Sequence, residues 1–307
     1  MDNPEKRQQE LWAQIAICEG EEKVEALMEL GHDAFHEGKH TESLALCEAA
    51  CQIYESMGAQ ASPTCVGHVY RTIGWCLNEL KRYPEAAAAA HRATEIYREI
   101  NDSDLLKTLN EEGDYWYSAE NWEKSYTAYK ASLEDVNPNR SDELLALTYS
   151  HCGFALGKMK RNQEALEHFL KSREGFRKLK NPWQVAFCDE EISFCYYKLK
   201  NQEKAMEFAQ KALDFAGLSE APYRVIWANA RMGLARKLAG EYKLALEHFE
   251  ISKKYLLKQS KVYWPSLVKI ESVIADVYEE EGRLEEAKEC RRRLKTLEET
   301  VVPDPDL

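Results

Sequence analysis

Small residues recur at a regular spacing on the apolar helical faces predicted along this chain. Seven anchor positions carry glycine, serine or alanine, and each is followed 12 residues later by a second small residue, its counterpart. The anchors are Gly31, Gly74, Gly113, Gly153, Ser193, Gly233 and Ala275, and the counterparts are Ser43, Ala86, Ser125, Ala165, Ala205, Ala245 and Ala287. Successive anchors lie 43, 39, 40, 40, 40 and 42 residues apart. Such a period is typical of a solenoid, in which each unit buries its apolar face against its neighbours.

Each unit has the pattern of two helices joined by a short turn. In residues 183–216, apolar side chains recur at steps of three and four residues up to Leu199 and again from Ala205. Residues 200–202, Lys-Asn-Gln, interrupt the pattern and predict the turn. We name the first helix of each unit helix A and the second helix B. The small residues predict the crossing point of the two, because Gly233 and Ala245 would let the backbones approach.

The ends of the chain depart from the repeat, as the ends of solenoids do. Residues 1–20 are predicted to form an N-terminal capping helix that opens at Asn3 and Pro4. Residues 21–300 are predicted to form seven repeats in a single solenoid domain, whose last helix, about Leu284 to Thr300, closes the other end. Residues 301–307 are expected to be a disordered acidic tail.

Composition narrows the class of protein. Of 307 residues, 44% are hydrophobic and 31% charged, and the formal net charge of −12 argues against nucleic acid as a partner. No apolar run approaches the roughly 18 residues of a membrane helix, and the N-terminus has no apolar signal core, so neither a membrane partner nor secretion is expected. The nine cysteines include no CxxC pair. A reducing compartment, and therefore a cytoplasmic protein, is expected.

The residues around the anchors resemble the tetratricopeptide repeat. Gly74 stands with Ile73, Leu77, Tyr83 and Ala86 in the spacing of that family's pattern, and the residues around Gly233 do the same. The resemblance covers roughly residues 24–300, with units near 40 residues instead of 34, as in kinesin light chains and the Rap and MalT-like regulators. It implies an all-α, right-handed α-solenoid of about seven helical hairpins with capping helices. It also implies a scaffold, an adaptor or a peptide-sensing regulator.

In this family helix A lines the concave surface, and the resemblance places the partner-facing side chains at fixed offsets from each anchor. The candidate partner-binding residues are Arg71, Trp75, Asn78, Lys107, Asn110, Tyr117, Phe154, Phe187, Glu190, Phe194, Tyr197, Trp227 and Leu234. From Phe154 onward the set is mainly aromatic and apolar. Two interpretations remain open: a partner covers these side chains, or they pack between successive repeats.

The predicted function is non-catalytic: a scaffold, adaptor or regulator that holds a partner protein, as a helix or peptide, in the concave groove. Self-association is possible. A Rap-like peptide sensor is an alternative, although one helix precedes the first repeat where that group has a three-helix bundle. The asparagine that holds an extended peptide in kinesin light chains is absent after every anchor.

A metal enzyme is an alternative from another class. His32 and His36 lie one helical turn apart, a spacing that can hold zinc, but they do not form the HExxH motif. The sequence contains no GxSxG, no phosphate-binding loop and no glycine-rich dinucleotide turn. No catalytic residues, metal or cofactor are therefore expected.

Overall fold

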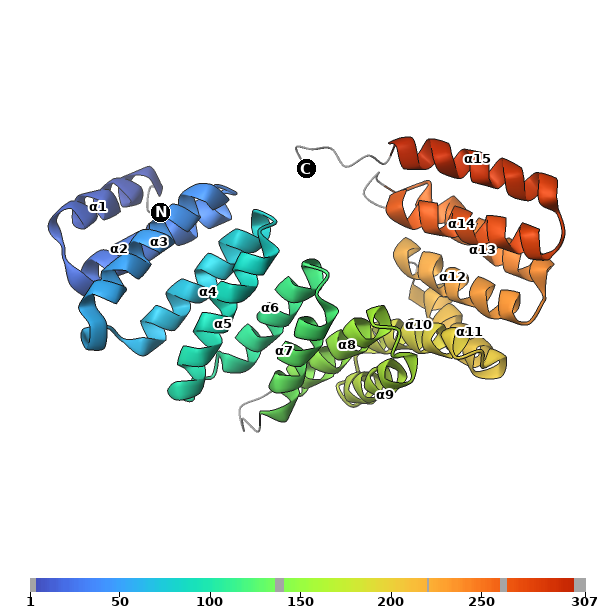
Figure 1. The fold of residues 1–307 in the computed structure, drawn as a ribbon, viewed down its shortest axis with the longest axis horizontal. Coiled ribbons are helices and arrows are strands. Elements are labelled where there is room, and N and C mark those ends of the chain that lie inside the picture. Colours follow the sequence, from blue (N-terminus) through green and yellow to red (C-terminus); the bar gives the residue numbers. More distant parts are fainter. Residues whose placement is uncertain (1–3, 136–140, 220, 260–263, 301–307) are drawn as a thin grey trace. The chain divides into compact units, whose positions relative to one another are not determined.

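The computed structural model describes residues 4–135, 141–219, 221–259 and 264–300, and this part of the chain is built from α-helices without a strand (Figure 1). The helices are α1 (Pro4–Ile17), α2 (Gly20–His36), α3 (His40–Met57), α4 (Pro63–Glu79), α5 (Tyr83–Glu99), α6 (Leu105–Ser118), α7 (Trp122–Glu134), α8 (Asp142–Lys158), α9 (Asn162–Lys178), α10 (Pro182–Lys198), α11 (Gln202–Ser219), α12 (Pro222–Leu238), α13 (Tyr242–Leu256), α14 (Trp264–Glu280) and α15 (Leu284–Thr300). A short 3-10 helix, η1 (Gly58–Gln60), follows α3. The predicted all-α class is confirmed.

The chain divides into two compact units, Met1–Met159 and Lys160–Leu307. Unit 1 holds α1 to α8, and unit 2 holds α9 to α15. In unit 1 the A helices are α2, α4, α6 and α8, and in unit 2 they are α10, α12 and α14. The proposed division into capping helix, single repeat domain and tail stays a prediction, and the tail at 301–307 lies outside the described residues.

The small residues mark the crossing of helix A and helix B, as predicted. The Ser43 hydroxyl on α3 donates a hydrogen bond of 2.6 Å to the carbonyl of Gly31 on α2. The Ser193 hydroxyl on α10 donates one of 2.8 Å to the carbonyl of Ala205 on α11. A Cβ atom added at Gly74 would lie 3.3 Å from a backbone carbonyl oxygen of α5. Anchor and counterpart therefore bring the two backbones together in each of these hairpins.

The turn between helix A and helix B repeats one backbone geometry. Its second residue has a positive φ, 77° at Gly38 but also 59° at Lys81 and 62° at Lys200. The next amide then donates back into helix A, as Arg82 N–H does to the Leu77 carbonyl at 2.8 Å. This pairing satisfies carbonyls at the end of helix A. The geometry is thus kept even where the residue is not glycine.

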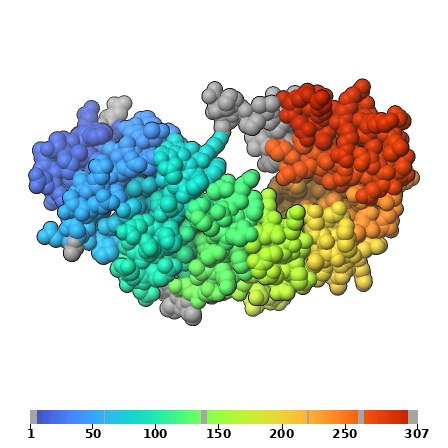
Figure 2. Space-filling view, viewed as in Figure 1, coloured from blue at the N-terminus to red at the C-terminus, as the bar shows by residue number. Residues whose placement is uncertain are grey.

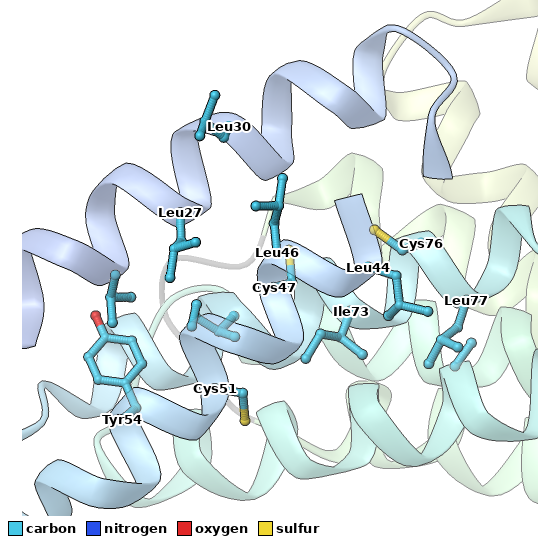
Figure 3. Packing of buried hydrophobic residues seen from close by; sticks show 14 of the residues in the cluster. Leu27, Leu30, Leu44, Leu46, Cys47, Cys51, Tyr54, Ile73, Cys76 and Leu77 are labelled. Carbon is cyan, nitrogen blue, oxygen red and sulfur yellow. The ribbon is translucent and has the colours of Figure 1, made fainter. Parts of the chain in front are cut away.

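Apolar side chains from consecutive helices form the core of each unit. In unit 1, Leu27 and Leu30 of α2 belong to one cluster with Leu44 of α3 and with Ile73 and Leu77 of α4 (Figure 3). In unit 2, a second cluster joins α12, α13, α14 and α15. In the space-filling view the helices of each unit close into a continuous surface (Figure 2). Among the described residues, no helix combines the length and the apolar character that a membrane span requires.

At the Gly233 anchor, an aromatic ring of helix B fills the space that a larger side chain would need. A Cβ at Gly233 would lie 2.6 Å from Cε1 of Phe249, which is fully buried. We expect Gly233→Ala to lower the free energy of unfolding by about 1–3 kcal/mol, because the ring must move within a packed core. The measurement is urea unfolding followed by circular dichroism.

Gly217 provides the matched control for Gly233→Ala. It lies in helix α11 of the same unit, and a Cβ there would meet nothing within 4 Å. Gly217→Ala should therefore raise stability by about 0.5–1 kcal/mol, since alanine is the better helix former. Equal effects of the two substitutions would contradict the crossing model.

Candidate functional site

The candidate binding residues lie on the A helices of the two units. Within unit 1, α6 contacts α8 as well as α7, and within unit 2, α10 contacts α12 as well as α11. Within each unit, neighbouring A helices therefore lie side by side, and we call the surface that the A helices of a unit present its A-helix face.

Arg71 connects two A helices in unit 1. Its Nε and Nη2 donate to the two carboxylate oxygens of Glu111 on α6, at 2.8 and 2.7 Å, and its Nη1 donates to Asp104 at 3.0 Å. Burial alone would lower the pKa of Arg71, but the two carboxylates outweigh it and raise the pKa. The guanidinium also lies 4.9 Å from the ring centre of Trp75. Arg71 is therefore a charged link between α4 and α6 at the edge of the A-helix face.

A pocket of about 460 Å³ opens beside this link, between α2 and α4. We call it the α2–α4 pocket. It is lined by Arg7, Met28, Glu29, His32, Asp33, His68, Arg71, Thr72, Trp75 and Asp104. Its size is within the range of small-molecule and side-chain sites.

Trp75 forms an aromatic wall of the α2–α4 pocket. Its ring meets the rings of His32 and Phe35 at centroid distances of 6.3 and 6.4 Å. On another part of the rim, His68 Nε2 lies 3.5 Å from Asp104 Oδ2. The pocket therefore combines aromatic surface with carboxylates.

Other predicted residues of unit 1 lie at the surface or half-buried. Lys107 is exposed and its Nζ lies 3.4 Å from Asp104, while the half-buried Asn78 donates to Glu79 at 3.1 Å. The half-buried Tyr117 ring meets Trp122 edge-on at 4.9 Å. Phe154 is half-buried on α8. None of these four side chains lines the α2–α4 pocket.

Asn110, assigned to the binding surface from the sequence, is buried. Its Nδ2 donates to the Leu106 carbonyl and to Ser132 Oγ, and its Oδ1 accepts from Thr148 Oγ1, at 2.8, 2.9 and 2.9 Å. These bonds join α6, α7 and α8. Because its polar atoms are used inside the protein, Asn110 is left out of the proposed binding surface.

The aromatic residues of unit 2 pack between repeats and carry cations on their rings. Phe194, Tyr197 and Trp227 are half-buried against the core cluster of α12 to α15, and Leu234 is buried within that cluster. The Arg231 guanidinium lies 4.5 Å from the Phe194 ring centre. Packing between repeats therefore accounts for much of this row, and Leu234 is left out of the proposed surface.

Glu190 is also buried and is likewise left out. Its Oε1 accepts from Arg224 Nη1 at 3.2 Å, in an ion pair whose two side chains are both at least nine-tenths buried. The same guanidinium lies 5.6 Å from the ring centre of Phe187, which is half-buried. Burial raises the pKa of Glu190 to about 7, although Arg224 and Arg231 act in the opposite direction.

His32 and His36, the two histidines of the metal-enzyme alternative, form an edge-to-face pair with ring centres 5.3 Å apart. Within the described ranges, no three His, Cys, Asp or Glu side chains are grouped as metal ligands.

Sequence reasoning missed several residues of the α2–α4 pocket. Glu29 and Asp33 lie four residues apart on α2, and this spacing alone indicates that their carboxylates share one side of the helix. Arg7 gave no such signal, because only the packing of α1 on α2 brings it to the pocket.

Stability should depend on the protonation of Glu190. Its pKa is higher in the folded protein than in the unfolded chain, so stability falls as pH rises from about 4.5 to 7 and then levels off. Between pH 5.5 and pH 8, the ionisation of Glu190 should lower the free energy of unfolding by roughly 2 kcal/mol. Glu190→Gln should remove that part of the pH dependence in urea unfolding.

Glu203→Gln is the control for this pH experiment, because Glu203 is exposed on the neighbouring α11. It should leave the pH dependence of the wild type in place. An unchanged pH dependence in Glu190→Gln would contradict the assignment.

Comparison with known proteins agrees with the helical repeat. Residues 23–99 match the family model described as tetratricopeptide repeat. A search of curated protein sequences gives no match.

Solved structures with a similar fold cover nearly the whole chain. The apo form of RapI is 15% identical, covers 91% of this chain and 98% of its own, and has a TM-score of 0.67. A signal-transduction ATPase with a tetratricopeptide repeat sensor from Pyrococcus horikoshii is 18% identical over 97% of this chain and 44% of its own, with a TM-score of 0.65.

The Rap conjugation gene regulator of plasmid pLS20, solved in complex with the Phr* peptide, is a third structure of this kind. It is 16% identical over 98% of this chain and 78% of its own, with a TM-score of 0.53. The predicted α-solenoid is thereby confirmed as the fold class. Residues 23–99 carry the tetratricopeptide repeat in their sequence, and the fold of the chain is similar to that of tetratricopeptide-repeat and Rap proteins.

Proposed function

We propose that this protein is a non-catalytic adaptor or regulator that binds a partner protein or peptide on its A-helix face. The α2–α4 pocket carries the proposal, because it is an open site lined by side chains of two successive A helices. Its wall includes Trp75, an aromatic residue of the type that contributes most to protein interfaces.

Exposed and half-buried residues extend this surface beyond the pocket. His32, His68 and Lys107 are exposed on the A helices of unit 1, and Trp75 and Tyr117 on the same helices are half-buried. In unit 2, Lys198 is exposed beside Phe194 and Tyr197, with its Nζ 5.0 and 5.6 Å from their ring centres. Such a mixture of aromatic and charged side chains is typical of surfaces that bind proteins.

A peptide is the favoured form of the partner. The pLS20 regulator, which has a similar fold, was solved with the Phr* peptide bound. A pocket of about 460 Å³ suits one or two side chains of such a ligand better than a whole folded domain. A peptide-sensing regulator is therefore the more specific version of the proposal.

The net charge and the cysteines support the remaining parts of the proposal. A formal net charge of −12 disfavours nucleic acid and anionic membrane surfaces as partners. All nine cysteines are free thiols and seven of them are buried, which supports a reducing compartment such as the cytoplasm.

Site-specific photo-crosslinking tests the proposed surface. A photoreactive phenylalanine at His68 or Lys107, on the A-helix face of unit 1, should cross-link one partner in cells of the source organism. The same group at Glu48 of α3 or Lys130 of α7, both exposed on B helices, should not. With the purified partner, Lys107→Glu should weaken binding by about tenfold and Glu48→Lys should not. Cross-linking only from the B helices would refute the proposal.

A further inference from the structure

We infer that the α2–α4 pocket binds the cationic end of an arginine or lysine side chain. The inference rests on the proposed function, since it names the chemical class of group that a partner would insert at that site. It is carried by three features of the pocket: the carboxylates on the α2 wall, the engagement of Arg71, and the surface formed by Met28 and Trp75.

Two carboxylates on α2 share one guanidinium. Glu29 and Asp33 lie one helical turn apart, and Arg7 of α1 reaches both of them. Arg7 Nη2 donates to Glu29 Oε2 at 3.1 Å, whereas Arg7 Nη1 is 3.9 Å from Asp33 Oδ1. Among the described residues, neither carboxylate has another ion pair. One Arg7 cannot neutralise both, so this wall of the pocket keeps acceptor capacity for a second cation.

On the opposite side of the pocket, the positive charge of Arg71 is already balanced by carboxylates. The Nε, Nη1 and Nη2 atoms of Arg71 are all engaged by Glu111 and Asp104. The Thr72 hydroxyl donates to the His68 carbonyl at 2.9 Å. An anion would therefore meet a guanidinium that two carboxylates already neutralise, whereas a cation can add to the carboxylates of α2.

The formal charge of the lining points the same way. Glu29, Asp33 and Asp104 outnumber Arg7 and Arg71, with the two histidines counted as neutral. Glu111, bound to Arg71 behind the lining, adds a further negative charge. With the chain itself at −12, a cationic ligand is favoured both at long range and within the pocket.

The pocket also suits the stem of a long basic side chain. Met28 and Trp75 supply thioether and indole surface beside the carboxylates. Arginine and lysine place their methylene stems on such surface while the charged end reaches an acceptor. A guanidinium can in addition stack on an indole ring, as Arg71 does on Trp75 at 4.9 Å.

Fluorine NMR of the full chain labelled with 5-fluorotryptophan tests the inference. Trp75→Phe identifies the Trp75 resonance. The probes are N-acetyl-arginine amide, its uncharged analogue N-acetyl-citrulline amide, and inorganic phosphate. We expect a saturable shift of the Trp75 resonance with the arginine compound, and none with the citrulline compound or with phosphate at the same ionic strength.

Two variants should change the affinity in opposite directions. Asp33→Asn removes a negative charge and should weaken arginine binding by about threefold, the scale of a half-exposed ion pair. Arg7→Gln removes the resident competitor and should strengthen binding by about threefold. A merely structural role of Arg7 would not produce tighter binding. Glu25→Gln on α2 and Lys6→Gln on α1 are the matched controls, since both residues are exposed and neither lines the pocket.

The inference is overturned if the citrulline compound shifts Trp75 as strongly, if phosphate binds instead, or if both variants leave the affinity unchanged. Equal melting temperatures of wild type and Arg7→Gln ensure that the result reflects the pocket. Photo-crosslinking of a partner from His68 would still support the proposed function after such a failure. The two proposals can therefore fail separately.

Discussion

The close crossing of helix A and helix B is the constraint on which the rest of this structure depends. At Gly233 the ring of Phe249 occupies the space that a Cβ would need, and the Tyr129 ring does the same at Gly113. Where the anchor is polar, as at Ser193, its hydroxyl bonds directly to the backbone of helix B at 2.8 Å. Because packed interiors tolerate little change in volume, these contacts fix the distance between the helices of each hairpin. They thereby also fix which side chains of helix A remain on the A-helix face.

The same face has to hold neighbouring repeats together. Arg71 pairs with Glu111, and Arg231 pairs with Glu191 at 2.6 Å, in each case across 40 residues, about one repeat. Asn110 uses its whole amide group for contacts within unit 1. Of these residues, Arg71 and Asn110 stand three residues before their anchors, a position at which the resemblance places partner-facing side chains. The surface left for a partner is therefore smaller than the sequence pattern alone implies.

Unit 2 contains a buried ion pair, Arg224 with Glu190, that is surrounded by aromatic rings. Arg224 lies close to Trp183, Phe187 and Tyr223, with its guanidinium 5.1–5.8 Å from their ring centres. Glu190 beside it has a pKa of about 7 because burial disfavours its ionised form. Such a pair adds little net stability compared with apolar residues, but removing one member leaves the other buried without compensation. Because the pair joins Glu190 of α10 to Arg224 of α12, it holds these two helices in a defined position.

The sequence alone determined the repeat, the helix pairs and the crossing residues, because these follow from local periodicity and from the size of single side chains. Helix α15 begins and ends at the predicted residues, and α1 begins at the predicted Pro4. The repeat pattern places Glu190 of α10 and Trp227 and Leu234 of α12 on the same side of helix A, but it does not distinguish a surface from a contact with the next repeat. That distinction depends on how closely successive A helices approach, and this is set by packing between residues about 40 positions apart. One wall of the α2–α4 pocket likewise depends on the docking of α1 on α2, which brings Arg7 to Glu29 and Asp33. Tertiary structure therefore decided which side chains a partner can reach.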